Sequence, residues 1–126
     1  MMQAKFLKLN DISAYKKSFN LSNQVWDLVL KWGYLAKDTV GKQFIRAVDS
    51  ISANIAEGFG RYHRKDKEKF YFNARGSVYE ALDWLQKAKV RKLLTDSAYK
   101  GIFDVLSDMP KEITALIRYT EEKLTR

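Results

Sequence analysis

The sequence predicts an all-α protein, folded as an antiparallel up-down-up-down four-helix bundle. Its 126 residues include only six glycines and one proline, too few turn formers for an all-β sandwich. Apolar residues recur at helical spacing in four long segments, which short polar connections separate. A chain of this length can bury one modest core but no second domain. We therefore expect an N-terminal arm over residues 1–10 and a single bundle domain over residues 11–126.

The first helix is expected from Ile12 to about Ala36, because this segment lacks proline and carries two apolar stripes. The stripe assigned to the core consists of Ile12, Tyr15, Phe19, Trp26, Val29 and Leu30. The stripe on the opposite side consists of Leu21, Val25, Leu28, Trp32 and Leu35. A bundle helix needs one apolar face for its own core, so a second stripe predicts an interface between subunits. The alternative is that the arm folds back over this surface.

The second helix is expected to follow a connection at residues 37–39 and to end near Phe59, where Gly58 and Gly60 signal termination. A loop at residues 60–64 then leads to a third helix over about residues 65–91. The predicted core stripes of these two helices are Phe44, Ala47, Val48, Ile51, Ile55 and Phe59, and Phe70, Ala74, Ser77, Val78, Ala81, Leu85 and Ala88. Phe72 and Tyr79 fall on the far side of the third helix, so we assign them to the subunit interface with Leu21, Val25, Leu28 and Trp32.

The fourth helix is expected from Thr95, a plausible N-cap, to about Leu124. Pro110 lies inside its regular apolar stripe and predicts a kink, because proline removes one backbone hydrogen bond. The alternative is a split into two helices, with Ser107 or Asp108 capping the second.

Basic residues exceed acidic ones, 23 to 15, which gives a net charge of +8 and a pI near 9.6. The excess lies in residues 1–92, which hold 18 basic and 9 acidic residues, whereas residues 93–126 hold 5 and 6. The predicted nucleic-acid-binding cluster, at the turn between the second and third helices, consists of Arg61, Arg64, Lys65, Lys67 and Lys69. Lysine and arginine bind phosphates without reading sequence, and the interleaved Tyr62 and His63 can stack on bases. The alternative is a solvated loop that keeps an oligomer soluble.

Composition argues against most enzyme classes. Cysteine is absent and His63 is the single histidine, so we expect no catalytic residue, no metal site and no cofactor. The alternative is an enzyme that uses Glu57 and Glu80 as a carboxylate pair. The first residues lack the apolar core of a signal peptide, and no run is long enough to span a membrane. We therefore expect a cytoplasmic protein.

The most distinctive segments are Ser-Ile-Ser-Ala-Asn-Ile-Ala-Glu-Gly-Phe-Gly-Arg at residues 50–61 and Ala-Arg-Gly-Ser-Val-Tyr-Glu at residues 74–80. Over about residues 11–124 the chain resembles the bacterial four-helix-bundle family that includes the 23S rRNA intervening-sequence proteins, although many members have proline where Ser52 stands. The resemblance implies a four-helix bundle that assembles as a barrel-shaped homopentamer. A distant similarity to the accessory variability protein of diversity-generating retroelements implies nucleic acid and a reverse transcriptase as partners. For the intervening-sequence branch itself, it implies no biochemical function.

The residues of these segments also predict a polar network between helices or between subunits, formed by Asn54, Glu57, Arg75 and Glu80. Gly76, in the interior of a helix, is expected to allow close packing. The leading hypothesis is a non-enzymatic oligomeric bundle that serves as a binding scaffold for RNA or DNA, with a reverse transcriptase or another protein as a further candidate partner. The alternative is a structural or protein–protein interaction module with no role in nucleic-acid binding.

Overall fold

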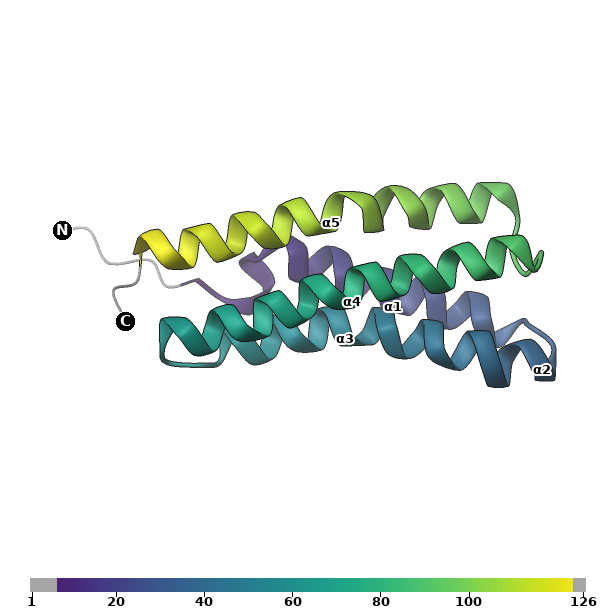
Figure 1. Ribbon diagram of the computed structural model, residues 1–126, viewed down its shortest axis with the longest axis horizontal. Helices are drawn as coiled ribbons and strands as arrows, with labels where there is room; N and C mark the ends of the chain where they lie inside the picture. Colours follow the sequence, from purple (N-terminus) through teal and green to yellow (C-terminus); the bar gives the residue numbers. More distant parts are fainter. Residues whose placement is uncertain (1–6, 124–126) are drawn as a thin grey trace.

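The computed structural model describes residues 7–123, which form an antiparallel bundle of long helices (Figure 1). The elements are η1 (Leu9–Asp11), α1 (Ser13–Leu30), α2 (Tyr34–Ala36), η2 (Lys37–Gly41), α3 (Lys42–Phe59), α4 (Arg64–Val90) and α5 (Asp96–Lys123). Helix α3 packs against α1 and α4, α4 packs against α5, and contact between α1 and α5 is sparser. The predicted four-helix bundle is confirmed, and residues 7–123 contain no strand. Assembly into a ring stays a prediction, and the first six residues of the expected arm lie outside the described range.

No helix between residues 7 and 123 is both long enough and apolar enough to cross a lipid bilayer.

The first helix is shorter than expected, because α1 ends at Leu30 and not near Ala36. Gly33 adopts an extended conformation, with φ −65° and ψ 164°, and Tyr34 begins the next helical segment. From there α2, η2 and α3 follow without a break, so the expected connection at residues 37–39 is helical, with π-helical hydrogen bonds. The absence of proline concealed this break, since a single extended glycine is enough to turn the chain.

The face of α1 that packs into the core differs from the one expected, although Ile12 and Val29 of the predicted core stripe are buried and Leu35 of the opposite stripe is exposed. Leu21, Val25 and Trp32 are buried, whereas Phe19 and Trp26, assigned to the core, are about half exposed. The buried face also contains small and hydroxylated residues, namely Ala14, Ser18 and Ser22. The two serine hydroxyls donate to carbonyls of their own helix, and a satisfied hydroxyl can be buried at little cost. Apolar periodicity missed this face because it scores serine as polar.

The core stripes expected for α3, α4 and α5 are confirmed in outline. Their fully buried side chains include Phe44, Ile51, Ile55, Leu85, Ile102, Leu106 and Ile113. In α4 the large buried aromatic residue is Tyr71 and not Phe70, which is partly exposed. The Thr95 cap is confirmed, because its Oγ1 accepts a hydrogen bond from the Ala98 backbone N–H at 3.1 Å. Helix α5 continues across Pro110, so the split is not observed.

Two of the three glycines singled out in the sequence, Gly58 and Gly76, have roles that differ from those expected, whereas Gly60 ends α3 as expected. Gly58 is buried inside α3, and a Cβ added there would lie 2.7 Å from the Tyr71 ring. Its role is therefore close packing of α3 on α4, whereas Gly60 is the C-cap. Gly76, expected to allow close packing, is exposed, and a Cβ there would meet no atom of the described chain within 4 Å.

Candidate nucleic-acid interface

The basic turn lies at one end of the bundle, between α3 and α4, beside the C-terminal end of α5 (Figure 1). Gly60 ends α3, and His63 precedes α4 in an extended conformation. Tyr62 is exposed, and its ring meets the His63 ring edge-on, with 5.0 Å between centroids. The turn therefore places two aromatic rings at the tip of the bundle, next to the start of the basic segment.

Two of the five predicted phosphate-binding cations are already partnered with carboxylates. The Arg61 guanidinium donates to Glu57 at 2.7 Å and also lies 4.7 Å from the centroid of the Phe70 ring. Arg64 forms an ion pair with Glu68 at 3.6 Å, which is too long for a hydrogen bond. Both pairs join positions i and i+4, with Arg61 in the turn just after α3 and Arg64 inside α4, and such pairs weaken with added salt. Both arginines are thus partly neutralised before any ligand arrives.

Lys67 has a structural role. Its Nζ donates to the backbone carbonyl of Phe59 at 2.8 Å and lies 3.5 Å from that of Gly58. The last carbonyls of a helix lack partners within the helix, so this ammonium satisfies the end of α3 from the facing helix. Partial burial lowers the pKa of Lys67 below its ordinary value of 10.5, since desolvation disfavours the charged form. Its assignment as a phosphate-binding residue conflicts with this geometry.

Lys65 and Lys69 remain as exposed cations of the turn. Neither forms an ion pair within residues 7–123, and the Lys69 Nζ lies 5.6 Å from the centroid of the Phe70 ring. Both stand in the first two turns of α4, where Asp66 also lies. The turn can therefore attract a polyanion, but through fewer free charges than the sequence suggests.

The predicted polar network does not form as a unit. Glu57 binds Arg61, the Arg75 guanidinium lies 5.9 Å from the Tyr79 ring centroid, and Glu80 is exposed. Asn54 instead donates to the Oγ and the carbonyl oxygen of Ser50, which lies one helical turn earlier in α3. These bonds are 2.9 and 2.8 Å long.

A hydrogen bond between two serine hydroxyls also joins α3 to α4, farther from the turn than the Lys67 contact. The Oγ atoms of Ser50 and Ser77 lie 2.9 Å apart. This contact sets the register of the two helices. Glu57 lies seven residues from Ser50 in the direction of the α3–α4 turn, whereas Glu80 lies three residues from Ser77 in the opposite direction. At 1.5 Å per residue, the two carboxylates are separated by about 15 Å along the bundle. They therefore do not form the close pair considered for acid–base chemistry. Nor do residues 7–123 gather three or more metal-ligating side chains.

The predicted interface residues divide into two groups. Leu21, Val25 and Trp32 belong to the chain's own core, so they are not available to a subunit interface, and Leu28 is partly buried against that core. Phe72 and Tyr79 are about half exposed on α4, as expected. The exposed apolar face of α1 consists of Phe19, Trp26 and Leu30, each about half exposed. The two predicted stripes of α1 are therefore each divided, because Val29 is buried as expected while Phe19, Trp26 and Leu30 are exposed.

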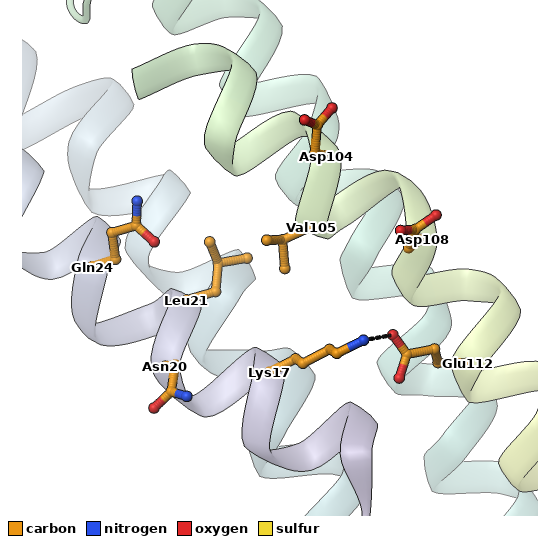
Figure 2. A pocket seen from close by; sticks show the side chains of 8 residues that line it. All are labelled: Lys17, Asn20, Leu21, Gln24, Asp104, Val105, Asp108 and Glu112. Carbon is orange, nitrogen blue, oxygen red and sulfur yellow. Dashed lines mark hydrogen bonds and ion pairs between the residues drawn. The ribbon is translucent and has the colours of Figure 1, made fainter. Parts of the chain in front are cut away.

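A groove between α1 and α5 has a volume of about 360 Å³ and is acidic along its α5 wall (Figure 2). Asp104, Asp108 and Glu112 follow one another at four-residue intervals and so share one face. Lys17 reaches across from α1 to Glu112 at 2.6 Å, and its hydrogen bond to that carboxylate raises its pKa. Leu21 and Val105 face each other between the helices. Three carboxylates repel phosphate, so this side of the bundle is unsuited to a polyanion.

Comparison with known proteins supports the same fold. The family model described as 23S rRNA-intervening sequence protein matches residues 10–115. The chain belongs to this family. A crystal structure from Bacteroides thetaiotaomicron, described as a protein of unknown function from the S23 ribosomal protein family, superposes with a TM-score of 0.76. The two chains are 22% identical, and the match covers 89% of this chain and 99% of the other. No curated protein matches the chain.

The region that matches the family contains both distinctive segments and the whole basic turn. It also contains Ser50 and Ser77, the pair that sequence reasoning missed. A single sequence does not show which residues of two facing helices meet, but two serines on facing small-residue stripes could have been paired. Membership of the family thus accounts for the fold, while the partners of each cation come from the structure alone.

Proposed function

We propose that the protein is a non-enzymatic helical scaffold that binds nucleic acid at the α3–α4 end of the bundle. The observation that carries the proposal is the charge distribution. The net charge is +8, and Lys65 and Lys69 are exposed cations at a tip that also presents aromatic rings. Such a surface binds phosphates by releasing counterions and is indifferent to base sequence. The family description names an intervening sequence of 23S rRNA, which makes RNA the first probe.

The proposal can be tested by fluorescence anisotropy with a labelled RNA of about 25 nucleotides, titrated at several salt concentrations. We expect binding at about 50 mM salt that weakens steeply by about 200 mM. The double variant Lys65→Ala/Lys69→Ala should lower the slope of log affinity against log salt by about 1.4, because each contact with a single strand contributes about 0.7. The matched control is Lys42→Ala/Arg46→Ala, two exposed cations at the other end of α3. An absence of binding by the unmodified protein at 50 mM salt would refute the proposal.

A second candidate function is protein–protein interaction, beginning with self-association. It is favoured by the exposed face of α1, where Phe19, Trp26 and Leu30 lie at spacings of seven and four residues. Water-exposed aromatic and aliphatic side chains at this spacing are typical of a face that another helix covers. An oligomer would also repeat the basic end once per subunit, which would raise the avidity for a long polyanion. The expected pentamer comes from the family resemblance.

Analytical ultracentrifugation at micromolar concentration tests this candidate. We expect the unmodified chain to sediment as an oligomer, and Trp26→Glu to shift it toward the monomer without loss of helical circular dichroism. Leu21→Ala is the control for a loss of stability at a buried position of the same helix. Loss of this leucine side chain should lower the free energy of unfolding by about 2–5 kcal/mol. A monomeric unmodified protein of 14.7 kDa would contradict self-association.

A further inference from the structure

A second groove runs along the bundle between α4 and α5 and has a volume of about 690 Å³. Arg75 and Tyr79 line it from α4, and Lys111, Arg118 and Tyr119 line it from α5. Thr114 and Ala115 are among the small residues of its lining. Its volume is about twice that of the α1–α5 groove and falls in the range of ligand-binding clefts.

The cations of this groove are unpaired. Arg75, Lys111 and Arg118 form no ion pair with any residue of the described chain. Most of the ion pairs that do form there join residues one helical turn apart. The Nε of Arg75 is also buried and lacks a hydrogen-bond partner in residues 7–123. A buried donor without an acceptor is costly, and a bound anion would supply the acceptor. Among the lining residues that lie within 7–123, Glu122 is the one carboxylate, so this part of the groove carries excess positive charge.

Two tyrosines supply flat, half-exposed rings beside these cations. Tyr79 and Tyr119 are 54% and 45% exposed, and the Arg75 guanidinium already lies 5.9 Å from the Tyr79 ring centroid. An aromatic ring stacks on an unpaired base, whose face is accessible, and not on a base within a duplex. A groove with guanidinium groups and aromatic rings therefore favours a single strand.

We propose that the α4–α5 groove binds single-stranded nucleic acid, with phosphates on Arg75, Lys111 and Arg118 and a base stacked on Tyr79. This inference rests on the proposed function and extends it to a surface that sequence reasoning did not assign. Lys111 and Arg118 lie two helical turns apart, about 10 Å along α5, so they reach different phosphates of one chain and not a single free phosphate.

The groove and the basic turn belong to the same half of the molecule. Arg118 lies in the last two turns of α5, whose C-terminal end is at the same end of the bundle as the α3–α4 turn (Figure 1). A strand that occupies the groove can therefore continue toward Lys65 and Lys69.

The experiment measures the affinity of a labelled 12-nucleotide RNA at 50 mM salt and above, as a single strand and annealed to its complement. The unmodified protein should bind the single strand more tightly. The variant Lys111→Ala/Arg118→Ala should lower the salt slope by about 1.4, whereas the control Lys42→Ala/Arg46→Ala should not change it. Tyr79→Leu should weaken binding about fivefold or more, and Tyr79→Phe, which keeps the ring, should bind like the unmodified protein.

The outcomes separate this inference from the proposed function. If the unmodified protein binds RNA but the groove variants behave like the control, the groove inference is wrong and the proposed function stands. If the unmodified protein binds no RNA, both are wrong. Equal affinity for single strand and duplex would overturn the single-strand assignment. If Lys111→Ala/Arg118→Ala leaves RNA affinity unchanged but alters sedimentation, the groove is an interface between copies, which also overturns the inference.

Discussion

Replacement of Gly58 by alanine directly tests the close packing of α3 on α4. The added Cβ would lie 2.7 and 2.9 Å from two atoms of the Tyr71 ring and 3.0 Å from the Lys67 carbonyl oxygen. Tyr71 is 2% exposed, so its ring has no free space to enter. Overpacking of this kind costs about 1–3 kcal/mol, and alanine recovers about 1 kcal/mol through its better helix propensity. The difference is a net loss of about 0–2 kcal/mol in the free energy of unfolding, and we expect a value near the middle, about 1 kcal/mol.

Urea denaturation followed by circular dichroism, at one fixed protein concentration, measures this loss. The double variant Gly58→Ala/Tyr71→Leu isolates the cause. With the ring removed, alanine at position 58 should cost about 1 kcal/mol less than it does beside tyrosine. If the alanine substitution changes the free energy of unfolding equally in both backgrounds, then α3 does not depend on a close approach to Tyr71.

Three further substitutions have expected effects of different sign. Gly76→Ala should raise the free energy of unfolding by about 1 kcal/mol, because the site is open and helical, and a loss in the same urea assay would mean that another chain packs there. Burial raises the pKa of Tyr71 to about 12, so the folded state holds the phenolic proton more tightly than the unfolded state does. The free energy of unfolding should therefore fall by about 2–3 kcal/mol between pH 10 and 12. Tyr71→Phe should remove this loss of stability at alkaline pH. Denaturation at pH 9 and at pH 11.5 compares the two proteins, and parallel pH profiles would contradict this account. Lys67→Met should lower the free energy of unfolding by about 1 kcal/mol, because the Phe59 carbonyl loses its hydrogen bond. The slope of log RNA affinity against log salt should not change. A lower slope would mean that Lys67 binds phosphate.

Sequence reasoning was most successful where a signal depends on one helix alone. The four long helices follow from apolar periodicity, and the start of α5 follows from the Thr95 side chain, which caps the first turn. The end of α4 also lies where it was expected, near Arg91, but the conformation that terminates the helix was not predicted. Lys92 adopts a left-handed conformation with φ 60°, and the Leu93 N–H donates to the Ala88 carbonyl, as glycine-terminated helices do. A lysine at that position carries no signal of a helix end.

The candidate site was predicted in composition but not in detail. The basic turn is where the sequence places it, yet Arg61 is paired and Lys67 caps α3. The cations of the α4–α5 groove lie far apart in the chain, with Arg75 on one helix and Lys111 and Arg118 on the next. Charge clustering along a sequence finds only neighbours in the chain, so it cannot find a cluster that two helices assemble.

The order of the amino acids is enough to predict a four-helix bundle. The helical spacing of apolar residues is a local property of each segment and does not depend on how the helices are arranged. Which face of α1 enters the core, and which cations are free, became clear only from the packed helices. Both depend on how each helix is rotated toward its neighbours. Close contacts such as that of Gly58 with Tyr71 help to set that rotation. So do buried hydroxyls that bond within their own helix, as in Ser18 and Ser22. Neither the glycine contact nor the serine hydroxyls contribute to hydrophobic periodicity.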